Sequence, residues 1–181
     1  MKTWIALFKG INVGGNNKVP MKALVQMFEG LGYQSVRHYI QSGNVVFQSN
    51  AKSTAALAKQ IVAAMQETFG FATHVLLIAG ADLDQAVAGN PYPELQDDDL
   101  AKMHLYCLDR EPAKIDTARI ASIIQPGERW HAKGAYFYLH TPGGAGNSKL
   151  AAQVEKITGT LATARNWRTV LTLQTMASEL G

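Results

Sequence analysis

The chain has 181 residues, and 47% of them are hydrophobic, which is enough for one domain or two small ones with packed cores. Its mean hydropathy is −0.06 and it contains no apolar run of about 18 residues, which argues against a membrane-spanning helix. The single cysteine, Cys107, excludes an internal disulfide. Together with an N-terminus that runs straight into a strand pattern, it predicts a cytoplasmic protein.

Charge is distributed in three blocks along the chain. Residues 1–80 carry seven lysines and arginines against two acidic residues, and residues 101–181 carry ten against six. Residues 81–100 carry six acidic residues and no basic one. We therefore expect two mildly basic units joined by an acidic connector. The connector is either an ordinary solvated linker or a segment that competes with, or shields against, a polyanion.

The first part of the chain alternates between strand and helix patterns. The predicted elements are a strand over 3–8, a helix over 20–31, strands over 36–40 and 45–49, a helix over 53–69 and a strand over 74–78. Pro20 suits the first turn of a helix, and Ser53 suits an N-cap. The resulting β-α-β-β-α-β order is that of the ferredoxin-like split unit.

The same order recurs in the second half. The predicted elements are a strand over 103–108, a helix over 115–124, a hairpin of 128–131 with 135–141, a helix over 150–157, a short strand over 160–164 and an amphipathic helix over 167–180. We therefore predict an α+β fold of two tandem ferredoxin-like (βαββαβ) subdomains plus a C-terminal helix. Residues 1–80 form the first subdomain, 81–100 the acidic connector, and 101–181 the second subdomain with the helix.

Topology predicts which loops meet. In a split unit the first two strands are parallel, because a right-handed crossover joins them, so the segments that follow them converge. In the first unit the candidate ligand-binding residues are Lys9, Asn12, Gly14, Gly15, Asn16 and Lys18, together with Gln41, Ser42 and Asn44. In the second unit the 142–148 loop should meet residues 165–168. The candidates there are Ser148, Lys149, Arg165, Asn166 and Arg168.

These candidates carry backbone N–H groups, amides, hydroxyls and cations, without a carboxylate, histidine or cysteine. Such groups suit the binding of a phosphate or polar ligand better than acid–base catalysis. Neither loop has the Walker order of glycine, lysine and serine or threonine, and no dinucleotide glycine pattern is present. The alternative interpretation is structural. The glycines then permit positive φ, the asparagines bond to their own backbone, and Ser148 caps a helix.

Aromatic residues in the second unit raise the question of RNA recognition on an open sheet face. Strand alternation predicts a face packed on the helices that holds Met103, Leu105, Cys107, Ala135, Phe137 and Leu139. The opposite face is predicted to hold His104, Tyr106, Tyr136, Tyr138 and His140. The aromatic residues lie one position out of the RNA-motif register. We therefore expect this face to be covered by the other unit or by the C-terminal helix.

The five histidines are scattered without metal-ligand spacing, and no Ser–His–Asp arrangement or general-base pair stands out. We therefore predict no metal site and no cofactor, and we name no catalytic residue. Whether the protein is an enzyme stays open.

Several segments closely resemble the bacterial family catalogued as domain of unknown function 1697. They are residues 5–15, 19–21 and 39–47, extended by 90–93, 148–150 and 163–170. The resemblance implies a compact cytoplasmic bacterial protein with two α+β subdomains. It brings no reaction, cofactor or catalytic residue.

From these features we expect a protein that binds a phosphate-bearing or polyanionic ligand, such as a nucleotide or RNA, through its polar glycine-rich loops. One alternative is an enzyme whose reaction needs orientation more than a titrating side chain. The other is a protein-interaction module whose loops are purely structural. No membrane partner is expected, and the sequence sets no oligomeric state.

Overall fold

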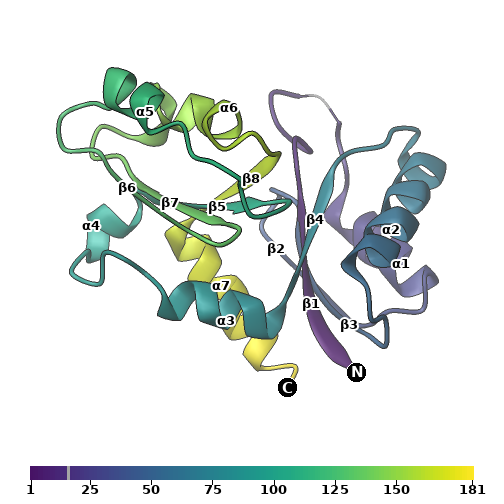
Figure 1. Ribbon diagram of the computed structural model, residues 1–181. Helices are drawn as coiled ribbons and strands as arrows, with labels where there is room; N and C mark the ends of the chain where they lie inside the picture. Colours follow the sequence, from purple (N-terminus) through teal and green to yellow (C-terminus); the bar gives the residue numbers. More distant parts are fainter. Residues whose placement is uncertain (16) are drawn as a thin grey trace. The chain divides into compact units, whose positions relative to one another are not determined.

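The computed structural model describes residues 1–15 and 17–181, which form two compact units (Figure 1). The first unit consists of residues 1–85 with 172–181, and the second of residues 86–171. The predicted ranges differ because they follow chain order, whereas residues 172–181 return to the first unit. There, Arg37 Nη1 donates to Glu179 Oε2 at 2.8 Å, and Gln48 Nε2 donates to the carbonyl of Leu180 at 2.8 Å.

The first unit contains a four-stranded antiparallel sheet. Its elements are β1 (Lys2–Phe8), α1 (Met21–Gly30), β2 (Gln34–Tyr39), β3 (Asn44–Ser49), α2 (Thr54–Phe69) and β4 (Val75–Ala79). The strand order is β2-β3-β1-β4. A further helix, α3 (Gly80–Ala88), begins at the residue after β4, and its first part still belongs to this unit.

The core of the first unit lies between the sheet and the helices α1 and α2, which cover the same face of the sheet (Figure 1). Alternate residues of β1, among them Ala6 and Phe8, contribute to this core. The ring of Phe28 on α1 packs edge-on against Phe8 and Phe47, with centroids 6.1 and 5.1 Å away. This packing fixes α1, and with it the loop that precedes α1.

The second unit contains another four-stranded antiparallel sheet, with the order β6-β7-β5-β8. Its elements are α4 (Asp97–Leu100), β5 (Met103–Leu108), α5 (Thr117–Ile123), β6 (Arg129–Lys133), β7 (Tyr136–His140), the 3₁₀ turns η1 (Ala145–Asn147) and η2 (Ala151–Gln153), α6 (Val154–Thr158) and β8 (Ala162–Asn166). Helix α7 (Trp167–Ser178) follows β8 directly, and its first five residues belong to this unit.

The predicted faces of β5 were wrong. Tyr106 lies opposite Phe137, and both side chains belong to the core that includes α5 and α6. Leu105 instead lies opposite Tyr138 and shares its face. The alternation within β5 and within β7 was predicted correctly. The register between the two strands was wrong by one residue, and such an error assigns the residues of β5 to the opposite face of the sheet.

The sheet face that carries Tyr138 is covered at that residue within the second unit. Tyr138 Oη donates to the carbonyl of Ala86 at 2.8 Å, and the Tyr138 ring centroid lies 6.2 Å from that of Trp167 at the start of α7. Tyr138 is only 1% exposed. This ring is therefore part of the packing and is not a platform for stacking bases.

The predicted α+β class is confirmed. The described residues form two four-stranded antiparallel sheets and seven α-helices. Across those same residues, no helix combines the length and apolar character that crossing a membrane requires.

Candidate ligand-binding loops and the acidic connector

Asn12 fastens the glycine-rich segment of the first unit to the neighbouring turn. Its Nδ2 donates to the carbonyls of Val19 at 3.0 Å and Gln41 at 2.9 Å, and its Oδ1 accepts from the Val19 N–H at 2.8 Å. Its backbone φ is 55°, a left-handed value that asparagine adopts more readily than most residues. The structure therefore brings the 9–19 segment and the 41–44 turn together where β1 and β2 end.

Gly43 allows these two segments to approach closely. The Phe8 N–H donates to the Gly43 carbonyl at 2.9 Å. A Cβ at Gly43 would lie 2.7 Å from both Phe8 Cβ and Ile11 Cδ1, and the φ of Gly43 is 71°. Both the space and the backbone conformation at this position therefore require glycine.

Asn44 is buried beneath the turn, with 0% exposure. Its Nδ2 donates to the carbonyl of Tyr39 at 3.1 Å and to Ser42 Oγ at 3.0 Å. The Nδ2 groups of Asn12 and Asn44 both hold the architecture of the loops. This is the structural role that the sequence left open for the asparagines.

The other candidates of the first unit are nearer to solvent. Lys18, Gly14 and Gly15 are exposed, and the two glycines have φ values of 59° and 81°. Lys9 is half-buried, and its backbone is fastened on both sides. Its N–H donates to the His74 carbonyl at 3.0 Å, and its carbonyl accepts from the Thr73 hydroxyl. Asn16 lies outside the described residues.

In the second unit the candidates have separate surroundings. Ser148 is 4% exposed, and its Oγ accepts from the Ala151 N–H at 3.0 Å, so it caps the following turn. Lys149 is exposed. Arg165 is half-buried in β8, where its Nη1 donates to the Ala164 carbonyl at 2.8 Å and desolvation lowers the pKa of its guanidinium to about 10. Of these three residues, only Lys149 is exposed.

Arg168 bonds to the end of the acidic connector, and Asn166 bonds to the residue that follows it. Asn166 Nδ2 donates to the Ala101 carbonyl at 2.6 Å, and its Oδ1 accepts from the Arg168 N–H at 3.0 Å, which caps α7. Arg168 Nη2 donates to the Asp97 carbonyl at 2.6 Å and lies 3.9 Å from Asp98 Oδ1. The sequence had placed these two residues beside the 142–148 loop, but these hydrogen bonds lead to residues 97–101.

The acidic connector, predicted over 81–100, is not a free linker. Its first part forms α3, and its second part packs within the second unit. Arg129 Nη1 lies 2.5 Å from Glu94 Oε1, and its guanidinium carbon lies 4.5 Å from the centre of the Tyr92 ring. Lys102 Nζ lies 3.2 Å from Asp99 Oδ1. Carboxylates of the connector thus meet cations of this unit at several points.

The candidates predicted from the sequence do not include a set of basic residues on β6. Arg129, His131 and Lys133 alternate along this edge strand, and all three are exposed. Their partners in the β7 register are His140, Tyr138 and Tyr136, so the three side chains share the face of the sheet away from α5 and α6. The period of two in the sequence Arg-Trp-His-Ala-Lys was the signal that pointed to them.

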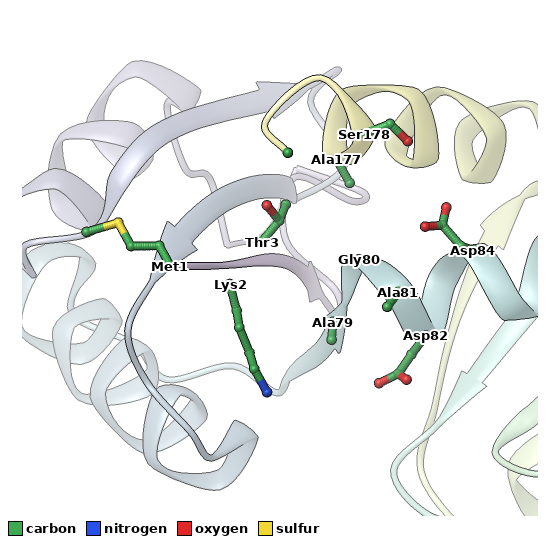
Figure 2. Close-up of a pocket in the computed structure, with 11 residues that line it drawn as sticks. Met1, Lys2, Thr3, Ala79, Gly80, Ala81, Asp82, Asp84, Ala177 and Ser178 are labelled. Atoms are coloured by element: carbon green, nitrogen blue, oxygen red, sulfur yellow. The ribbon is translucent and has the colours of Figure 1, made fainter.

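A pocket of the first unit lies where β4 passes into α3, with a cavity volume of about 460 Å³. Figure 2 shows Asp82 and Asp84 of α3 and Lys2 of β1 around it. Asp84 Oδ1 accepts from Gln174 Nε2 at 3.0 Å. Two carboxylates against one lysine side chain make this pocket a poor site for an anion, and the lining includes no candidate residue from the sequence.

Neither a reactive thiol nor a metal-binding cluster is found among the described residues. Cys107 is 2% exposed, and burial raises the pKa of its thiol to about 12, so the nucleophilic thiolate is not formed near neutral pH. Among the described residues, no group of three or more histidine, cysteine, aspartate or glutamate side chains is placed to hold a metal ion.

Comparison with known proteins links the chain to a solved bacterial structure and to a family of unknown function. The solved structure of the conserved bacterial protein SP0830 from Streptococcus pneumoniae is 25% identical, with a TM-score of 0.73, and the match covers 97% of this chain and 98% of that one. A comparison with curated proteins gave no match. The model of the family described as protein of unknown function, DUF1697, matches residues 1–138. The predicted membership is therefore confirmed, and the chain belongs to the DUF1697 family.

Proposed function

We propose that this protein binds a phosphate-bearing or polyanionic ligand, a nucleotide or RNA, through its polar glycine-rich loops. The observation that carries the proposal is the pair of hydrogen bonds from Asn12 Nδ2 to Val19 and Gln41, at 3.0 and 2.9 Å. These bonds tie Asn12 to Val19 and to the turn at Gln41, so the two ends of the stretch that carries exposed Gly14, Gly15 and Lys18 are anchored beside the start of α1. A loop whose ends are anchored loses less conformational entropy when it binds.

The chemistry of this loop favours an anion. Lys18 supplies a positive charge, and Gly14 and Gly15 leave the backbone uncovered by side chains. The loop leads into the N-terminus of α1, and the free N–H groups of a first helical turn carry partial positive charge. In the second unit, Lys149 directly follows Ser148 and is exposed, so it supplies a positive charge beside the turn that Ser148 caps.

A binding assay with one lysine removed tests the proposal. We expect Lys18→Ala to weaken the binding of a nucleotide or a short RNA by about threefold to tenfold at low salt, because one phosphate contact is lost. Lys59→Ala is the matched control, since Lys59 is an exposed lysine on α2 of the same unit. Equal affinities for the wild type and both variants, or an equal loss in the two variants, contradict the proposed site.

The two alternatives make different predictions for the same loop. An enzyme that orients its substrate through Asn12 loses turnover in the Asn12→Ala variant without losing stability. The hydrogen bonds of Asn12 instead indicate that this variant loses stability, which is also expected of an interaction module with structural loops. A thermal-shift screen with nucleotides, sugar phosphates and short RNAs separates the module from the binder, because a ligand that binds the folded state raises the Tm.

We also propose that both units are ferredoxin-like and that the protein is bacterial and cytoplasmic. The strand orders β2-β3-β1-β4 and β6-β7-β5-β8 support the first part, since in each unit the third strand lies between the first and the second. The lone, buried Cys107 and the Streptococcus pneumoniae neighbour support the second.

A further inference from the structure

A run of acidic residues crosses one end of the second sheet and meets cations from different elements. We call residues 94–99 the acidic segment; it contains Glu94, Asp97, Asp98 and Asp99. Glu94 pairs with Arg129 on β6 at 2.5 Å, while Asp98 lies 3.9 Å from Arg168 on α7. The Asp97 carbonyl also accepts from Arg168 at 2.6 Å. The acidic segment thus reaches from the β6 edge to the end of β8.

The cations that it meets continue into an exposed surface. We call Arg129, His131 and Lys133 the basic stripe. They occupy alternate positions of the edge strand β6, and alternate residues of a strand are about 6.6–6.8 Å apart. Tyr136 lies opposite Lys133, is half-buried and shares the same face. Glu94 therefore covers one end of the basic stripe, which has an aromatic ring near its other end.

We propose that the acidic segment is an internal substitute for a phosphodiester chain, and that single-stranded RNA binds the basic stripe and Arg168 by displacing Glu94 and Asp98. The proposal rests on the proposed function of the protein, polyanion binding, and adds a second site and its regulation. The carboxylates of the acidic segment stand in for phosphate oxygens on the two arginines. Arginine binds both groups with the same planar donor geometry.

The ion pairs of the acidic segment are exposed enough to be displaced. The side chains of Arg129 and Glu94 are 42% and 56% exposed, and those of Arg168 and Asp98 are 54% and 99% exposed. Pairs that water reaches are weak and are screened by salt. A ligand with one phosphate for each cation competes with them effectively, because it also gains from the release of its own counterions.

The surface favours RNA over a polyanion without bases. Single-stranded nucleic acid is bound by cations that follow its backbone, together with aromatic rings on which bases stack. The basic stripe supplies the cations, and Tyr136 supplies a ring on the same face. A sulfated polysaccharide would use the cations alone.

The test compares two triple variants that raise the net charge by the same amount. Glu94→Gln/Asp98→Asn/Asp99→Asn removes the carboxylates of the acidic segment that pair with cations. Glu29→Gln/Glu67→Gln/Glu111→Gln removes three exposed carboxylates elsewhere. The probe is a labelled oligouridylate of about 12 nucleotides, within the usual site size of single-strand binders. Fluorescence anisotropy at several salt concentrations gives the Kd and its salt slope.

We expect the acidic-segment variant to bind about tenfold more tightly than the control variant at low salt. Its salt slope should be steeper by about 1.4, because the control variant must first break two ion pairs, and the carboxylates freed in this way take up counterions. Adding Arg129→Gln and Arg168→Gln should remove this gain. Equal affinities of the two triple variants, or a gain that survives the loss of both arginines, overturn the proposal. A heparin fragment that binds the acidic-segment variant as tightly as the oligouridylate does overturns the assignment to RNA.

The wild type provides a second readout that needs no variant to fold. Hydrogen exchange of residues 92–101 should become faster when the oligouridylate is added, because the acidic segment leaves its cations. Unchanged or slower exchange in the bound state contradicts displacement. If the wild type binds in a Lys18-dependent way while this exchange stays constant, the proposed function stands and the inference fails. If neither the wild type nor any variant binds, the proposed function itself fails.

Discussion

At the scale of single residues, Asn12 and Gly43 explain why the first loop and turn meet. Asn12 bridges them with its side chain, and Gly43 lets them approach without a Cβ between them. Topology grouped the two segments correctly, but the residue types of Asn12 and Asn44 left both ligand binding and a structural role open. Amides that bind a ligand and amides that bind their own backbone look alike in a sequence, because the partner is decided by a few ångströms of loop geometry.

Substitution of Gly43 should be costly. In Gly43→Ala the new methyl group meets Phe8 and Ile11 at 2.7 Å, and the φ of 71° is unfavourable for alanine. We expect the free energy of unfolding to fall by about 2–5 kcal/mol, the sum of left-handed strain and overpacking. Urea unfolding followed by circular dichroism measures it.

Gly134→Ala is the matched control for this prediction. Gly134 has a φ of 56°, and no atom lies within 4 Å of the position that an alanine methyl group would take, so only the backbone strain of about 1–2 kcal/mol applies. Equal losses in the two alanine variants would show that the close approach at Gly43 contributes nothing.

At the scale of elements, the sequence predicted long periodic segments well. It predicted less well the short elements and the C-terminal residues 172–181, which belong to the first unit. The strand pattern of residues 3–8 and the capped pattern of α2 match β1 (Lys2–Phe8) and α2 (Thr54–Phe69) closely. The predicted strand over 160–164 lies at 162–166, because the capped end of α6 at Gly159 is followed by two residues outside the ladder. Such an offset leaves little trace in the sequence, since threonine and leucine suit a strand.

The acidic connector shows a second reason for a missed element. Charge alone left open a solvated linker or a segment that shields against a polyanion, and it did not predict that the second part of the connector pairs with Arg129, Lys102 and Arg168. The partners lie up to about seventy positions away along the chain, for example Asp97 and Arg168. Pairing at such separations depends on the tertiary fold, and a single sequence does not specify it.

Helix capping gives a prediction at this scale. Asp116 Oδ1 accepts from the Arg119 N–H at 2.9 Å at the start of α5, a helix of seven residues, and Ser53 Oγ accepts from the Ala56 N–H at 3.4 Å at the start of α2. We expect Asp116→Ala to lower the free energy of unfolding by about 1 kcal/mol, and Ser53→Ala to lower it by less, because its bond is longer. Thermal unfolding gives the ranking.

Asp116→Asn serves as the control for the capping prediction, because asparagine retains an oxygen that accepts from the same N–H. It should keep most of the stability that alanine loses. If the asparagine and alanine variants are equally destabilised, then capping is not the role of Asp116.

At the scale of the whole molecule, the second unit holds two histidines whose pKa values are lowered by burial. For His104 burial is the main cause. For His140, burial is again the largest cause; the positive charges of Arg129 and Lys102 act in the same direction, and the negative charges of Asp99 and Glu94 oppose them. Both imidazoles therefore resist protonation in the folded state.

Acid should destabilise the fold through these two groups. The unfolded chain binds a proton at each histidine near pH 6.5, whereas the folded chain does so only at lower pH. The stability is thus complete above about pH 6.5 and decreases as the pH falls below it. Urea unfolding at several pH values between about 7.5 and 5 should show this loss, and His140→Gln should reduce its pH dependence. A free energy of unfolding that is constant through this range contradicts the assignment.

The basic stripe of β6 has a consequence for self-association. Within the described residues, β6 pairs only with β7, so its other edge offers backbone groups to which a strand of another chain could add. Charged side chains on an edge strand oppose such pairing, because a second copy would bring like charges together. Arg129, His131 and Lys133 therefore also act as gatekeepers against aggregation. Any polyanion that neutralises them removes this protection while it covers the same edge.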